Sequence, residues 1–205
     1  MANWFGLHDA PAGIQDMNTF TRLKKTGLIR IPWHYPCPNL MGMIRNTPSL
    51  YLNGEFKRLN KRNKQDLTEI IKQSIKRSFS SLEEQVEIEK IMNHLRQWWM
   101  AVRMKKGDYI YIRGKRSDTS GNRRILKRGF IVQVEDNNIY DIPSSIFDPE
   151  LDITSRWTSQ QVRKVKIIKE VSDQFYNTFP YWLTSIKRFK KEDDIKLLIN
   201  EMELI

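Results

Sequence analysis

The stretch Lys105–Gly114, KKGDYIYIRG, decides the fold class because its side chains alternate between two faces. Tyr109 and Tyr111 fall on one face of an extended chain, whereas Ile110 and Ile112 fall on the other. This period of two predicts a half-buried strand. The chain therefore changes at this point from a helical pattern to a strand pattern.

Further strands are predicted close by. Residues 129–143, GFIVQVEDNNIYDIP, contain two apolar runs joined by a polar turn at 136–138, which is typical of a hairpin. Residues 161–171, QVRKVKIIKEV, alternate clearly, and LIRIPW at Leu28–Trp33 follows Gly27, the expected stop of a short helix. Because the connections are mostly short or polar, the sheet is expected to be mainly antiparallel.

Helical segments lie before and after these strands. Residues 65–79, QDLTEIIKQSIKRSF, and residues 80–104 place apolar side chains at spacings of three and four. Residues 172–205 are predicted to close the chain with one or two helices. The expected fold is α+β, a small twisted sheet curled into a partial barrel and flanked by helices. We expect a single domain over residues 1–205 with a helical insertion at about 55–103.

Positive charge is concentrated in two blocks. The chain has 205 residues, with 35 Lys and Arg against 24 Asp and Glu, a formal charge of +11. Residues 103–128 hold ten basic and two acidic side chains, and residues 57–77 hold eight basic and two acidic ones. The first block flanks a predicted strand and favours a polyanionic partner, nucleic acid first. The second block lies on a predicted helix, where lysines commonly keep a surface soluble.

No catalytic pattern is recognisable. The acidic residues near the strands lack the following lysine of a restriction-type nuclease core, and no glycine-rich phosphate loop or nucleophile elbow is present. His34 lies three residues before Cys37, but the prolines around this pair favour a packed cysteine over a nucleophile. We therefore expect no enzyme activity, no cofactor and no metal.

The composition favours a cytoplasmic protein. One cysteine excludes a disulfide framework, and the first residues show no basic and apolar signal-peptide pattern. No apolar run approaches the roughly 18–20 residues that span a bilayer, so no membrane partner is expected.

Aromatic residues surround the basic strands in the sequence. Trp98 and Trp99 continue an apolar helical stripe, which favours a place in the core. Trp33 and Trp157 instead stand beside polar or proline-rich loops, where a ring can line a pocket and stack on a base.

Three segments together resemble a known family. They are TGLIRIPW (Thr26–Trp33), WWMAVRMKKGDYIYIRG (Trp98–Gly114) with the following GFIVQVED, and RWTSQQVRKVKIIKEV (Arg156–Val171) with the following FPYWLTSIKRF. Their order resembles the PUA-like superfamily, in particular the EVE-like modules of modification-dependent restriction systems. The resemblance extends from Gly27 to Ile199 and implies a pseudo-barrel that binds nucleic acid.

The resemblance also implies a site and partners. The resemblance implies a reader of a modified DNA base in prokaryotic or phage defence, either as a stand-alone protein or as the specificity part of a complex with a separate nuclease or NTPase. A base pocket is expected from Trp33, Tyr111 and Trp157. Phosphate contacts are expected from Arg113, Lys115, Arg116, Arg123, Arg124, Lys127 and Arg128. Two alternatives remain open: a protein-interaction or regulatory subunit of a defence complex, and an RNA-binding module.

Overall fold

The computed structural model describes residues 2–9, 23–31, 39–76, 81–114, 129–143, 159–180 and 186–204. The chain divides into two compact units. Unit 1 comprises Met1–Pro32, Met104–Asp136 and Lys164–Ile205, and unit 2 comprises Trp33–Arg103 and Asn137–Arg163. Unit 2 contains the residues of the expected helical insertion, about 55–103, together with a later part of the chain.

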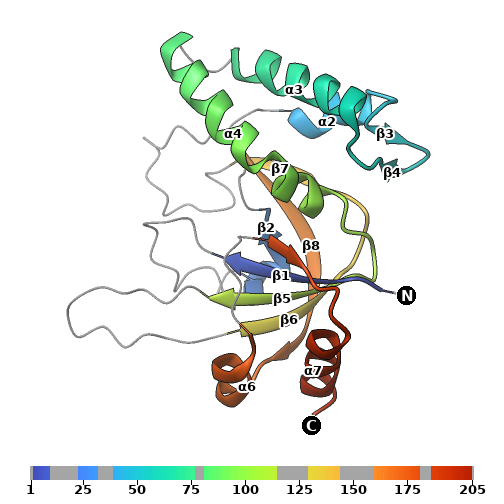
Figure 1. Cartoon of the computed structure of the whole chain (residues 1–205), viewed down its shortest axis with the longest axis vertical. Coiled ribbons are helices and arrows are strands. Elements are labelled where there is room, and N and C mark those ends of the chain that lie inside the picture. The colour runs from blue at the N-terminus through green and yellow to red at the C-terminus, as the bar shows by residue number, and fades with distance from the viewer. Residues whose placement is uncertain are drawn as a thin grey trace, which may run out of the picture. The chain divides into compact units, whose positions relative to one another are not determined.

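The sheet path is β2 (Leu28–Arg30), β8 (Ser159–Glu170), β6 (Gly129–Val134), β5 (Tyr109–Gly114), β1 (Trp4–Asp9) and β9 (Ile186–Arg188). It curls into a half-barrel, which confirms the α+β class (Figure 1).

The sheet is mixed rather than uniformly antiparallel. β5 pairs antiparallel with β6, and β6 with β8, but the first strand, β1, runs parallel to β5. β9 then adds an antiparallel edge to β1. An alternating pattern shows which side chains share a face, but it does not show the direction of the neighbouring strand. The parallel pairing of β1 with β5 therefore could not be predicted from it.

The expected hairpin over residues 129–143 is wrong in its pairing. β6 and β7 (Tyr140–Pro143) both exist, but each pairs antiparallel with a different part of β8. In unit 1, β6 lies beside residues 165–170, and in unit 2, β7 lies beside residues 159–162. The twelve-residue β8 therefore pairs with both β6 and β7, in place of the direct β6–β7 pairing that the hairpin required.

The KKGD segment forms the turn that starts β5. The Asp108 carboxylate accepts hydrogen bonds from the Lys105 N–H at 2.8 Å and from the Asn3 N–H at 2.9 Å. Gly107 has a φ of +87° and donates its N–H to the Val134 carbonyl at 2.9 Å. A buried carboxylate with several N–H donors is a stable turn anchor. This motif therefore joins the starts of β1 and β5 to the end of β6.

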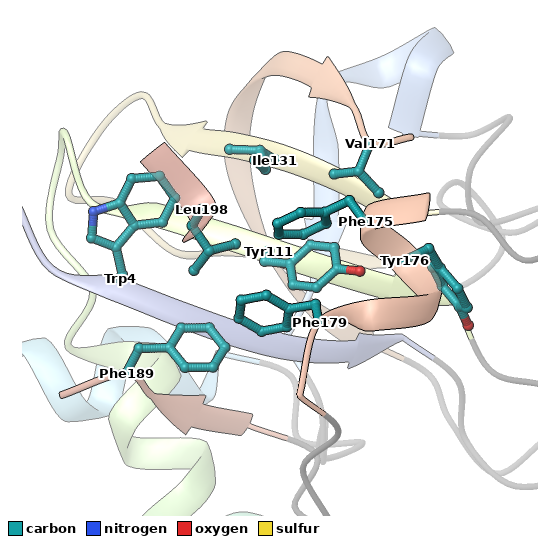
Figure 2. Packing of buried hydrophobic residues seen from close by; sticks show 9 residues of the cluster. All are labelled: Trp4, Tyr111, Ile131, Val171, Phe175, Tyr176, Phe179, Phe189 and Leu198. Atoms are coloured by element: carbon teal, nitrogen blue, oxygen red, sulfur yellow. The ribbon is translucent and has the colours of Figure 1, made fainter. Parts of the chain in front are cut away.

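Both faces of the unit 1 sheet are covered by apolar side chains. One face of the sheet carries the buried Phe5, Leu7, Ile110, Ile112, Phe130, Val132 and Val134. The other face packs against α6 (Asp173–Thr178) and α7 (Glu192–Glu203) through a mainly aromatic cluster, shown in Figure 2. Its members are Trp4, Tyr111, Ile131, Val171, Phe175, Tyr176, Phe179, Phe189 and Leu198.

Unit 2 is built mainly from helices. It contains α2 (Leu40–Arg45), α3 (Lys61–Lys76) and α4 (Ser81–Val102), together with a short hairpin of β3 (Tyr51–Leu52) and β4 (Glu55–Phe56). α3 buries Leu67, Ile71 and Ile75, the stripe that the helical spacing predicted. The fully buried Arg163 donates from Nη2 to the carbonyls of Ala101 and Val102 at 3.2 and 2.8 Å. A guanidinium thereby caps the last carbonyls of α4, where the helix dipole favours a cation.

Candidate nucleic-acid interface

Most residues of the expected site lie outside the described part of the chain. This applies to two of the expected pocket aromatics, Trp33 and Trp157. It applies also to the expected phosphate contacts Lys115, Arg116, Arg123, Arg124, Lys127 and Arg128. Tyr111 and Arg113, both on β5, are the two expected site residues that the structure describes.

Tyr111 is a core residue, which corrects its expected place in an open base pocket. Its side chain is 0% exposed and meets Phe175 and Phe179 edge-on, with ring centroids 5.5 and 5.3 Å apart. Figure 2 shows the ring between these two side chains. Burial raises the pKa of the Tyr111 hydroxyl far above its ordinary value. The ring therefore packs α6 onto the sheet.

Arg113 is also used inside unit 1, which corrects its expected contact with a phosphate. Its side chain is 8% exposed, and Nη2 donates to the Tyr176 carbonyl at 2.8 Å while Nη1 donates to the Phe179 carbonyl at 3.3 Å. The guanidinium carbon lies 4.5 Å from the centre of the Tyr176 ring. Arg113 therefore caps the end of α6 and adds a cation–π contact there.

The described tryptophans are buried. Trp98 and Trp99 lie in the core of unit 2, as their place in the apolar stripe predicted, and Trp4 lies in the cluster of unit 1. The Trp99 ring nitrogen donates to the Lys57 carbonyl at 2.9 Å. These rings stabilise the two units and leave no open face for a base to stack on.

A cluster of exposed cations lies at and just before the start of α3. The segment 57–64, KRLNKRNK, has basic side chains at Lys57, Arg58, Lys61, Arg62 and Lys64, and all five are exposed. Among the described residues, none of the five side chains makes an ion pair or a hydrogen bond. We call these five residues the 57–64 surface.

The backbone beneath the 57–64 surface is held by several hydrogen bonds. Asn60 and Asn63 cap the helix reciprocally, each backbone N–H donating to the other side-chain oxygen at 2.7 and 3.0 Å. The Asn63 side chain also donates to the Arg58 carbonyl at 2.9 Å, and the Lys57 N–H donates to the Leu50 carbonyl at 2.8 Å. Asn–Asn capping satisfies N–H groups that otherwise lack partners at a helix start.

Residues 57–65 contain no acidic side chain that could compensate the charge of the 57–64 surface. The first turn of α3 carries no acidic residue, although a helix N-terminus disfavours cations. The nearest acidic residue that follows, Asp66, accepts a hydrogen bond from Ser49 at 2.5 Å. Like charges crowded at the positive end of a helix destabilise it slightly, and an anion placed there removes this cost. The 57–64 surface can therefore receive a polyanion.

The sequence contains the signal for this surface, because residues 57–77 form one of its two basic blocks. Composition alone does not distinguish a solvated helix face from a set of cations without acidic neighbours. The distinction comes from Asp66 and Glu69, which hydrogen-bond Ser49 and Lys72 respectively.

Comparisons with known proteins name no family for the chain: no family model, curated protein or solved structure matches it. Among the described residues, no group of three or more His, Cys, Asp or Glu is arranged to hold a metal ion. None of the described helices is both long and apolar enough to cross a membrane.

Proposed function

We propose that the chain binds nucleic acid, with DNA as the preferred form, and that the 57–64 surface contacts the phosphate backbone. The observation that carries this proposal is the set of five exposed cations that have no acidic partner among the described residues. Lysine and arginine gain affinity for a polyanion by releasing its condensed counterions. Hydrogen bonds to the Lys57 and Arg58 carbonyls fix the backbone that carries the first two cations. This supports the proposal, because a preorganised segment loses less conformational entropy when it binds.

The other cationic block completes the proposal. Residues Lys115–Arg128, which the structure does not describe, are proposed as a separate set of phosphate contacts. The likeness to PUA-like modules adds a finer proposal, a reader of a modified base that uses Trp33 and Trp157. Binding of a probe panel with plain, 5-methylated and hydroxymethylated cytosine tests that finer proposal, because Trp33→Ala should abolish any preference for the modified probes.

The test of nucleic-acid binding is a salt titration. Fluorescence anisotropy with a labelled duplex of about 20 base pairs measures the dissociation constant at several salt concentrations. If all five cations contact phosphates, the logarithm of the association constant should fall against the logarithm of the salt concentration with a slope of about −4.5. Each contact contributes about −0.9 to this slope. A double variant, Lys61→Ala with Lys64→Ala, should reduce the slope by about 1.8 and weaken binding to all sequences alike.

The matched control removes the same charge from unit 1. Lys164 and Lys196 pair with Glu135 at 3.6 Å and with Glu192 at 2.9 Å, so their cations are already compensated. The double variant Lys164→Ala with Lys196→Ala should leave the salt slope nearly unchanged. Absence of salt-dependent binding in the unaltered chain, or equal losses in both double variants, would contradict the proposed role of the 57–64 surface. Competition between matched DNA and RNA probes tests the preference for DNA.

A further inference from the structure

The β3–β4 hairpin next to the 57–64 surface has a tightly defined tip. Tyr51 pairs with Phe56 and Leu52 with Glu55, so two residues, Asn53 and Gly54, form the whole turn. Their φ values are 52° and 81°, the positive pair that a type I′ turn requires and that Asn-Gly adopts readily. The turn therefore fixes the direction in which the tip projects from unit 2.

The base of the hairpin is anchored by aromatic rings. Tyr51 and Phe56 lie 4.8 Å apart between ring centroids, and Phe56 meets the buried Trp99 edge-on at 6.0 Å. The Arg103 Nε donates to the Phe56 carbonyl at 3.3 Å. Two-stranded hairpins are marginal in isolation, so these contacts with α4 explain how this one holds its shape.

The tip itself presents an apolar side chain to solvent. Leu52 is 47% exposed, and the turn residues and Glu55 beside it are exposed as well. Lys57 lies opposite Leu50, two residues before Leu52, as the Lys57 N–H to Leu50 carbonyl bond of 2.8 Å shows. Two residues of strand measure about 7 Å. Leu52 thus lies near the first cation of the 57–64 surface, about 7 Å along the hairpin and one strand spacing of about 5 Å across it.

We infer that Leu52 is a wedge that enters between stacked base pairs of duplex DNA and kinks it. This inference rests on the proposed function, nucleic-acid binding, and adds that the protein bends the bound DNA. Apolar side chains inserted at a base step unstack it, and the resulting kink lets the duplex meet more of the protein. The anchored hairpin supplies the wedge, and the cations at Lys57 and Arg58 hold the adjoining phosphates, which offsets the unstacking.

Glu55 gives the inference an internal check. Its carboxylate lies at the paired position across from Leu52 and brings negative charge close to the phosphates of a wedged duplex. The variant Glu55→Gln keeps the shape of the tip and should therefore strengthen binding by a few-fold, with the kink retained.

The experiment measures bending and binding on the same DNA. A duplex of about 20 base pairs carries a donor and an acceptor dye at its two ends, and a second copy carries one dye for anisotropy. Saturating protein should raise energy transfer, because a kink of roughly 20–90° shortens the end-to-end distance. Leu52→Ala should lose that rise, while its affinity falls by no more than about tenfold, the contribution of burying the exposed half of a leucine.

A second exposed leucine provides the matched control. Leu197 on α7 is 45% exposed, so Leu197→Ala removes the same side chain from a comparable surface and should bend DNA like the unaltered protein. Circular dichroism verifies that each variant is folded. Bending by Leu52→Ala equal to the unaltered protein, or binding without any bending, would overturn the wedge and leave nucleic-acid binding intact. Failure to bind the duplex at low salt would overturn the proposed function itself.

Discussion

The end of β5 and the start of α3 both belong to strongly basic stretches of the sequence, but they use their cations in opposite ways. At the end of β5, Arg113 is buried and donates to the Tyr176 and Phe179 carbonyls. At the start of α3, five basic side chains are exposed and meet no acidic partner among the described residues. The net charge of a segment therefore does not distinguish buried cations that stabilise the fold from exposed cations that can bind a ligand.

The physical reason for the difference is the position of each cation on its element. Alternation along β5 puts Arg113 on the same face as Tyr109 and Tyr111, which α6 and α7 cover. A planar guanidinium suits that place because it can donate to two carbonyls at once. Lys61 and Lys64, in contrast, are exposed in the first turn of α3, ahead of the buried Leu67 and Ile71, where solvent or a ligand can meet them.

The other described ion pairs of unit 1 support the same comparison. Lys24 pairs with Glu170 at 3.0 Å, and Lys187 lies 3.8 Å from the largely buried Asp194. Pairs of this kind contribute little to stability when exposed, but they compensate charge that a polyanion would otherwise meet. The proposal for the 57–64 surface therefore depends on the missing acids as much as on the basic residues.

The prediction with the largest expected effect compares two arginine-to-methionine substitutions, one at Arg113 at the end of β5 and one at Arg62 at the start of α3. Arg113→Met should lower the free energy of unfolding by about 2–4 kcal/mol, because two charge-assisted hydrogen bonds and a cation–π contact are lost in a buried place. Arg62→Met should change it by no more than about 0.5 kcal/mol. Urea denaturation measures both, and equal effects would break the division between structural and available cations.

Gly129 offers a second, somewhat smaller test beside Arg113, its partner across β5 and β6. A Cβ at position 129 would lie 2.8 Å from the Tyr111 ring and 2.9 Å from a Val171 methyl carbon. Gly129→Ala should therefore destabilise unit 1 by about 1–3 kcal/mol, because a close-packed core accommodates an added methyl group only by shifting. Gly54→Ala is a poor control, since its φ is positive.

Exposed Gln73→Ala on α3 is the better control for the Gly129 test, with an expected change of about 0.5 kcal/mol or less. Thermal denaturation followed by circular dichroism compares the two variants. A neutral Gly129→Ala would show that the face of β5 that carries Tyr111 and Arg113 has room to spare, and that would weaken the reassignment of both residues to the core.

Much of the fold could be predicted from periodicity, and the parts that could not share a cause. The strands around Tyr111, Ile131 and Val165, the helices α3 and α4 and the stop at Gly27 all follow from local patterns. The β1–β5 parallel pair and the division of β8 between β6 and β7 depend on tertiary pairing, which period alone does not specify. The three-residue β9 is too short to show a period.

The site was less predictable than the fold. Alternation along β5 showed that Tyr111 and Arg113 share a face, but it did not show that α6 covers that face. The hairpin at Asn53-Gly54 has one of the clearest turn sequences in the chain, yet its strands are only two residues long and lie within a region of mainly helical pattern. An exposed Leu52 beside cations therefore becomes visible only in the folded chain.

The smallest expected effect extends the comparison from the buried Arg113 to a partly buried acid in unit 2, Asp141. The Asp141 carboxylate accepts hydrogen bonds from the Met41 N–H at 3.2 Å and from the Gln161 amide at 3.0 Å. Burial raises its pKa above the ordinary value, although both hydrogen bonds and the charge of Arg45 oppose the shift. Ionisation of Asp141 therefore costs the folded state more than the unfolded chain.

The sign of the pH dependence follows from that raised pKa. A carboxyl group with a higher pKa in the folded state stabilises the fold below its unfolded pKa, and this contribution is lost as the pH rises through the folded value. Asp141→Asn cannot accept both hydrogen bonds, so it should be less stable than the unaltered chain at low pH. Because the variant does not ionise, the gap in unfolding free energy should narrow as the pH rises, whereas parallel curves from urea denaturation would show that Asp141 ionises as easily as an exposed carboxyl group.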